Sequence, residues 1–429
     1  PEISIGDSRL MIEPLFQLRR LCHAGIAILI ALSWSSMADA STSSVVERGR
    51  YLAIAGNCVA CHTKPGGQPH AGGLKFDTPF GVLYSTNITP DRATGIGSWS
   101  LAQFSAALRS GTRPNGEHLY PVFPYTAYTK LTDADVAALY AYFKSLKPVS
   151  QRPPANEMRF PFGERALLGP WKSLFFEDAR FVRKADRSAE WNRGAYLVEA
   201  LGHCSACHSP RNALGAEDTN LLMTGGVHAH TDADGRTRQW AASNLTNSPA
   251  GLAVWTVDDL SGYLHRGISP RAAVFGPMNE VVASLSQLPS ADVRAMAVYL
   301  KSLPANRQTV KSETLDVDTM SEGRILYNIH CGTCHQPEGT GGSDTGPPLA
   351  GSAVVNAPSH ESLVNIILRG PDRPKVAPSA EWQKRRWKMM ESFGDKLGDD
   401  EVAAIATYVR NSWGHTGAAV TEESVARQR

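Results

Sequence analysis

Three copies of one pattern, Cys-x-x-Cys-His, are the residues of this chain whose types and spacing could carry chemistry. Two thiols separated by two residues can add to the two vinyl groups of one haem, and the histidine after the second thiol can bind its iron. The pattern therefore predicts three covalently attached haems c. The attachment residues are Cys58, Cys61, Cys204, Cys207, Cys331 and Cys334, and the iron ligands that follow them are His62, His208 and His335.

Zinc binding and dithiol redox chemistry are the alternatives for a Cys-x-x-Cys pair. A zinc site would need a second pair of ligands near each motif, and the sequence offers none. A thioredoxin-like dithiol would need a strand–helix–strand setting, which does not surround these motifs. Three copies, each followed by a stretch of domain size, favour haem attachment.

Methionine is the usual second axial ligand in electron-carrying cytochromes c, where its thioether favours ferrous iron. In the second unit we assign this role to Met278, in the turn Gly-Pro-Met at 276–278. In the third unit Met389 and Met390 both precede the closing helical segment, and we choose Met390. A methionine taken alone is usually a core residue, so the assignments depend on its recurrence at corresponding points.

The first unit departs from this rule, because the sequence has no methionine between His62 and Met158. Phe123 stands in the corresponding turn, and a phenyl ring cannot bind iron. The first haem then has another ligand or an open face. His118 is the nearest strong donor, with Lys130 and Met158 as alternatives, and the other interpretation of His118 is a surface or propionate-contacting histidine.

The elements that must position these motifs recur in the same order. A helical segment with an early glycine precedes each motif, a short helix ending in glycine follows, and a longer helix closes the unit. The middle helices are predicted at 99–111, 255–267 and 360–370, and the closing helices at 133–146, 291–303 and 399–412. Glycines 49, 194 and 323 should permit a close helix crossing. We expect an all-α fold of three tandem domains like class I cytochrome c, joined by proline-rich linkers.

The length of the chain and the stretches between closing and opening helices indicate the domain boundaries. A chain of 429 residues suggests about three domains. We expect a signal peptide at 1–40, cytochrome c domains at 41–150, 187–305 and 319–415, linkers at 151–186 and 306–318, and a flexible tail at 416–429. These three domains are called the first, second and third unit below. An aromatic cluster in the first linker is expected to pack across two units.

The leader predicts export. Arg19 and Arg20 precede an apolar run and the small residues Ala38 to Ala40, which is typical of a secretory signal cleaved after Ala40, and Met11 is the expected start because residue 1 is proline. The seventh cysteine, Cys22, lies in this leader. The net charge of +2 gives no support for nucleic-acid binding. We expect a periplasmic protein with peripheral membrane association.

Three runs resemble a known family. They are Ser-Thr-Asn-Ile-Thr-Pro at 85–90, His-Leu-Tyr-Pro-Val-Phe-Pro-Tyr at 118–125 and Tyr-Val-Arg-Asn-Ser-Trp-Gly at 408–414. They are similar to the triheme cytochrome c subunit of bacterial periplasmic, membrane-associated dehydrogenase complexes. The resemblance implies Met278 and Met390 as ligands opposite the second and third irons. Many members have methionine where this chain has Phe123, so the resemblance leaves the first ligand open.

The resemblance also implies a function. The subunit would accept electrons from a catalytic dehydrogenase, which is a quinoprotein, a flavoprotein or a molybdenum hydroxylase, acting on an alcohol, sugar acid, aldehyde or N-heterocycle. It would pass them to ubiquinone or a terminal oxidase at the outer face of the cytoplasmic membrane. The sequence contains no nucleotide loop, flavin fingerprint or catalytic triad. The alternatives are a self-contained haem enzyme with an open first haem, such as a peroxidase or a thiosulfate-oxidising cytochrome, and a free periplasmic shuttle.

Overall fold

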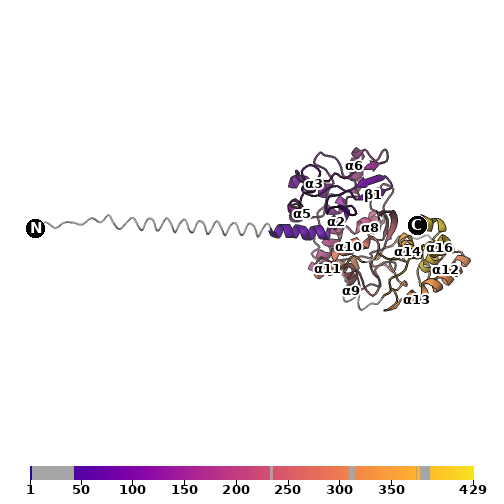
Figure 1. Ribbon diagram of the computed structural model, residues 1–429. Coiled ribbons are helices and arrows are strands. Elements are labelled where there is room, and N and C mark those ends of the chain that lie inside the picture. The colour runs from indigo at the N-terminus through magenta and orange to yellow at the C-terminus, as the bar shows by residue number, and fades with distance from the viewer. Residues whose placement is uncertain (2–42, 232–234, 309–314, 373, 377–386) are drawn as a thin grey trace.

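The computed structural model describes residue 1 and residues 43–231, 235–308, 315–372, 374–376 and 387–429. Residues 2–40 of the predicted signal peptide, with Cys22 and Met11, lie outside the described residues. The third unit, coloured orange to yellow, lies on the opposite side of the molecule from helices α3 and α5 of the first unit (Figure 1).

Each motif follows an opening helix and forms a short helix of its own. The opening helices are residues 43–55, α7 (Ala189–Tyr196) continued by η2 (Leu197–Leu201), and α12 (Val317–His330). The motif helices are α2 (Cys58–Cys61), α8 (Ser205–His208) and α13 (Gly332–His335). The closing helices are α5 (Asp133–Ser145), α11 (Ser290–Lys301) and α16 (Asp399–Arg410). Opening and closing helices pack together in every unit.

A glycine makes each of these crossings possible. A Cβ atom at Gly49, Gly194 or Gly323 would collide with a backbone oxygen of the closing helix. The oxygens belong to Ala138, Ala295 and Ala404, in that order. The close helix crossing expected from the sequence is therefore confirmed in all three units.

The middle helices form as predicted. They are α3 (Leu101–Ser110), α9 (Val257–Arg266) and α14 (Glu361–Arg369), each followed by a glycine with positive φ. Ser100 and Thr256 accept hydrogen bonds from the backbone N–H three residues on, which caps the first two helices. Two further helices, α4 (Tyr125–Tyr128) and α10 (Met278–Leu285), precede the closing helices of the first two units.

The expectation of an all-α fold was incomplete, because the chain also contains two small antiparallel sheets. Strands β1 (Lys75–Thr78), β2 (Gly81–Tyr84) and β3 (Glu157–Met158) form one sheet in that order. Strands β4 (Gly226–Thr231) and β5 (Thr237–Ala242) form the other. Strands β1, β2, β4 and β5 belong to the long loops after the first two motifs, and β3 is added by the segment after α5. Residues outside the helices there pair their backbone groups with each other.

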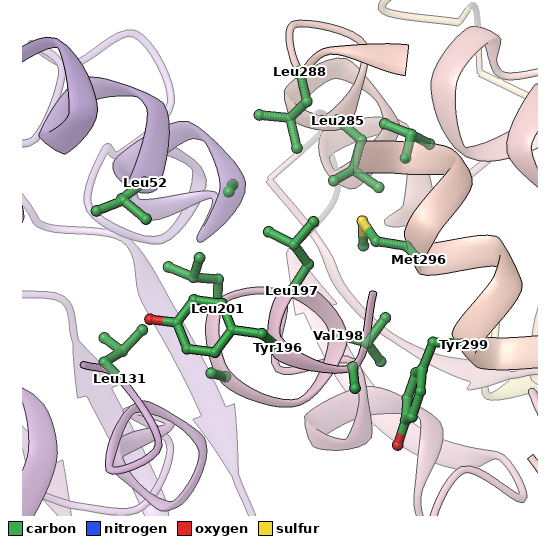
Figure 2. Packing of buried hydrophobic residues seen from close by; sticks show 14 of the residues in the cluster. Leu52, Leu131, Tyr196, Leu197, Val198, Leu201, Leu285, Leu288, Met296 and Tyr299 are labelled. Atoms are coloured by element: carbon green, nitrogen blue, oxygen red, sulfur yellow. The ribbon is translucent and has the colours of Figure 1, made fainter. Parts of the chain in front are cut away.

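One hydrophobic core serves the first two units together, and the third unit has its own. Figure 2 shows Leu52 and Leu131 of the first unit facing Tyr196 and Leu201 of the second. All four side chains are at most 7% exposed. The first two units are therefore joined by continuous apolar packing and not only by a linker.

The segment predicted as the first linker is folded. It contributes β3, the 3-10 turn η1 (Arg165–Leu167) and α6 (Leu168–Phe175). Trp171 donates its indole N–H to the Leu214 oxygen of the second unit at 2.9 Å, and the Phe181 ring lies 5.4 Å from the Tyr196 ring. The expected packing of these aromatic residues across two units is confirmed. Residues 309–314 of the other linker lie outside the described part.

The C-terminal segment differs from the flexible tail that we expected. It forms α17 (Glu422–Ala426) against α16, and the side chains of Val420 and Val425 are buried in the core of the third unit. Arg429 donates to the backbone oxygen of Leu397 at 2.7 Å. Burial of two valines explains why a short, polar stretch is docked. None of the helices described is both long enough and apolar enough to cross a membrane.

Candidate haem-binding sites

Each motif histidine is held by the same hydrogen bond. Its Nδ1 lies 2.7 to 2.8 Å from a backbone carbonyl oxygen in the loop that follows the motif. The acceptors are Thr86 for His62, Ser243 for His208 and Pro347 for His335. A carbonyl can only accept, so Nδ1 carries the hydrogen and Nε2 keeps the lone pair that a metal needs. Burial lowers the pKa of all three rings, which favours this neutral form.

The first thiol of each motif packs against an apolar core, whereas Cys61 and Cys207 are exposed. The six cysteines, all within the described residues, form no disulfide with one another. Burial raises the pKa of Cys58, Cys204 and Cys331 to about 12. Such surroundings suit the edge of a bound porphyrin, which is largely apolar. The thiols, the imidazoles and the cores therefore fit covalent haem c in each unit.

The loops after the three motifs also share a backbone shape that the sequence did not reveal. A glycine N–H donates to the oxygen of each motif histidine, and the residue two positions earlier has φ between 62 and 65°. These donors are Gly72, Gly225 and Gly341, and the residues with positive φ are His70, Met223 and Gly339. Because the residue types differ, only the backbone shows that the three loops are equivalent.

The two predicted methionine ligands lie against the cores. Met278 is the first residue of α10 and packs against the core shared by the first two units. Met390 packs against the core of the third unit, whereas the neighbouring Met389 is 59% exposed. This difference supports the choice of Met390 over Met389.

The three side chains considered as ligands of the first haem make contacts with other parts of the chain. Both ring nitrogens of His118 face α6, where Nδ1 lies 3.0 Å from Lys172 Nζ and Nε2 lies beside Gly169. Lys130 donates to Glu199 of the second unit at 2.7 Å. Met158 lies on the edge strand β3. This arrangement gives no support to His118 as an iron ligand and favours the interpretation of it as a structural histidine.

Phe123 and Tyr128 lie in the segment of the first unit that corresponds to the one carrying Met278 in the second. Phe123 packs against the same core as Met278, and its ring lies 5.5 Å from the Tyr128 ring. Burial raises the pKa of Tyr128 well above its ordinary value, and the nearby Cys58 and Cys61 thiols raise it further. Tyr128 therefore borders the first attachment site. The sequence reasoning missed it because a tyrosine in an apolar segment is most often a core residue.

Two matching networks hold the first and second motifs together. In each, an aspartate of a closing helix binds an arginine from its own unit and a tyrosine hydroxyl from the other unit. Asp135 binds Arg48 at 2.5 Å and Tyr196, while Asp292 binds Arg193 at 2.8 Å and Tyr51 at 2.6 Å. The two units are thus related by a local two-fold arrangement. The motifs are close, since burial and then the neighbouring Cys207 thiol raise the pKa of Cys61 to about 11.

The third unit docks through a different surface. Ser362 on α14 donates its hydroxyl to the Ala241 oxygen of β5 at 2.8 Å, and Asn365 donates to the Gln239 oxygen at 2.8 Å. The hairpin β4–β5 therefore connects the second unit to the third.

With this geometry in place, comparison with known proteins defines the class. The chain matches the cytochrome c family over residues 46–147 and 320–413. It is therefore a c-type cytochrome, and this family carries covalently bound haem c. The second unit lies outside both matched segments, although it repeats their motif and helix crossing.

Relatives define the particular family. The chain is 40% identical to a gluconate 2-dehydrogenase cytochrome c subunit from Pantoea cypripedii, over 94% of this chain and 93% of that protein. It is 38% identical to the fructose dehydrogenase cytochrome subunit of Gluconobacter japonicus, over 90% and 82%. It is 43% identical to a nicotinate dehydrogenase subunit of Pseudomonas putida over 88% of this chain, but spans only 30% of that longer protein. The chain belongs to the family of electron-transferring cytochrome c subunits of dehydrogenase complexes.

Proposed function

We propose that this subunit binds three haems c and conducts single electrons from a catalytic dehydrogenase to ubiquinone or a terminal oxidase. The observation that carries the count of three is the hydrogen bond from Nδ1 of every motif histidine to a loop carbonyl. When bound, each haem would supply an iron that accepts and releases one electron. Cys58, Cys61, Cys204, Cys207, Cys331 and Cys334 would hold the three groups covalently.

The chain's own residues set the conditions for transfer. Nε2 of each motif histidine is oriented by the hydrogen bond on Nδ1, so no reorganisation of the ring is needed when the charge on the iron changes. Met278 and Met390 would supply thioethers opposite His208 and His335, which raises the reduction potentials of these two sites. The surrounding cores exclude water and lower the local dielectric constant.

Because the first two units share one core, they would act together as one electron-transferring unit. The networks around Asp135 and Asp292 hold the two motif helices in fixed relative positions, and Cys61 and Cys207 are neighbours there. The third unit would exchange electrons with this pair through its docking on β5. Domains at 41–150, 187–305 and 319–415 are the corresponding division of the chain.

The partner is a catalytic dehydrogenase subunit. Relatives named for gluconate, fructose and nicotinate dehydrogenases support donors that are alcohols, sugar acids, aldehydes or N-heterocycles, oxidised by a quinoprotein, a flavoprotein or a molybdenum hydroxylase. The leader at 1–40 supports export to the periplasm, with attachment to the outer face of the cytoplasmic membrane through the complex.

A haem count tests the proposal. The chain matured in a host that attaches haem c should contain three equivalents by pyridine haemochrome assay. Replacing Cys204 and Cys207 by alanine should leave two, whereas Cys22→Ala in the leader should leave three. Fewer than three equivalents in the unmodified chain, or zinc in place of iron, would contradict the proposal.

A second experiment tests the assignment as a subunit. The purified, haem-loaded chain should not oxidise an alcohol, aldehyde or N-heterocycle with an artificial acceptor. Addition of the dehydrogenase with which it copurifies should allow substrate to reduce its haems. Substrate oxidation by the chain alone would identify it as an enzyme in its own right.

A further inference from the structure

The first unit differs from the other two in the segment between the middle and closing helices. In the second and third units a methionine lies between the middle and closing helices and packs against the core. In the first unit the same segment places Phe123 against the core. The sequence provides no methionine anywhere between His62 and Met158.

The three side chains considered as donors for the first haem are engaged in other contacts. His118 faces α6 and accepts from Lys172, while Lys130 is paired with Glu199. Met158 forms part of the ladder between β2 and β3, opposite Gly81. Moving any of these three to the first motif would break a contact that joins the connector or the second unit to the first.

A further histidine, His70, has a buried Nδ1 with no hydrogen-bond partner, but it lies in the loop after the first motif. Its equivalents in the other two loops are Met223 and Gly339, and not the proposed ligands Met278 and Met390.

Phe123 and Tyr128 form an aromatic wall beside the first attachment site. Their rings lie 5.5 Å apart, and the Tyr128 ring also packs edge to face on His203 of the second unit at 5.6 Å. Phe123 has no donor atom. Phe123 therefore fills space in this wall but cannot be the sixth ligand of an iron.

We propose that the first haem site has no protein ligand opposite His62, and that the open face of this haem, beside Phe123 and Tyr128, binds a small exogenous ligand such as carbon monoxide or cyanide. The inference rests on the proposed attachment of three haems. It assigns to the first unit a ligand-binding role that the second and third units lack.

Spectroscopy of the complete, haem-loaded chain tests this inference. Ferric protein should show one high-spin and two low-spin haems by electron paramagnetic resonance, and the ferrous protein should bind one carbon monoxide per chain. Phe123→Met should convert the first site to the low-spin form and abolish carbon monoxide binding. As a matched control in the second unit, Met278→Ala should create a second binding site.

The outcomes separate the two proposals. Three haems that are all low-spin, with no binding of carbon monoxide or cyanide, would overturn the inference and leave the proposed function intact. Fewer than three haems would overturn the proposed function and the inference with it. If Tyr128→Phe turned a low-spin first haem into a high-spin one, Tyr128 would be the ligand and the inference would be wrong.

Discussion

The hydroxyl of Tyr196 should contribute measurably to the stability of the first two units. It donates to Asp135, whose side chain is 1% exposed and is also paired with Arg48. Tyr196→Phe removes this donor and leaves a buried carboxylate oxygen with one partner fewer. A hydrogen bond to a charged group contributes about 1.5–3 kcal/mol, and we expect a loss of that size.

The matching variant Tyr51→Phe should cost less. Asp292 is more exposed, at 18%, and keeps a hydrogen bond from Arg193 at 2.8 Å. A loss near about 1.5 kcal/mol is expected. For a body of this size, each kcal/mol shifts the melting temperature by about 2–4 °C, so Tyr196→Phe should lower it by about 3–12 °C.

The assay is denaturant unfolding of the haem-loaded chain, followed by haem absorbance and circular dichroism. The midpoint should fall while the slope of free energy against denaturant stays constant. Tyr84→Phe is the control, because the Tyr84 hydroxyl donates at 3.0 Å to Glu157 in an exposed pair. Its loss should cost less than about 0.5 kcal/mol. If Tyr196→Phe were no more destabilising than Tyr84→Phe, the networks would not hold the units together.

Three further predictions follow from the same structure. Burial raises the pKa of Asp292, but hydrogen bonds from Arg193 and Tyr51 lower this pKa more. The contribution of Asp292 to stability is therefore present above about pH 4 and is lost as the pH falls through the depressed pKa. Asp292→Asn should reduce this loss of stability at acid pH, as measured by unfolding midpoints at a series of pH values. Gly194→Ala should destabilise the second unit by about 3 kcal/mol or more, because its Cβ would collide with a closing-helix oxygen, whereas Gly163→Ala, whose Cβ has space, should melt like the unmodified chain. Deleting residues 416–429 should lower the stability of the third unit by about 3 kcal/mol through the loss of two buried valines, and an unchanged third-unit transition by calorimetry would contradict this account.

Much of the local structure could be predicted from the sequence. The middle and closing helices are found where helical spacing and terminal glycines place them, and Gly194 meets the closing helix as expected. The hairpin β4–β5 was missed, although the Asp-Gly pair at 234–235 between two short runs is a sequence signal for it. Val425 was misjudged because a single valine in a polar stretch gives no periodicity.

The candidate sites also have some features that could be predicted from the sequence and others that depend on the fold. The motif cysteines and histidines lie within five residues of one another, so their chemistry depends on a single helical turn and was readable without the fold. The carbonyl that orients His62 comes from Thr86, on a loop whose path depends on packing. Likewise, nothing near His118 in the sequence indicates that its ring faces Lys172.

The sequence by itself determined the covalent chemistry: three attachment sites, three histidines and the missing methionine of the first unit, because these depend on residue type and short spacing. Only the tertiary structure decided which units share a core, which carbonyl orients each imidazole and which side chains border the first site. Those features depend on contacts between residues far apart in the chain, such as Tyr51 with Asp292, and such contacts arise only when apolar surfaces pack together.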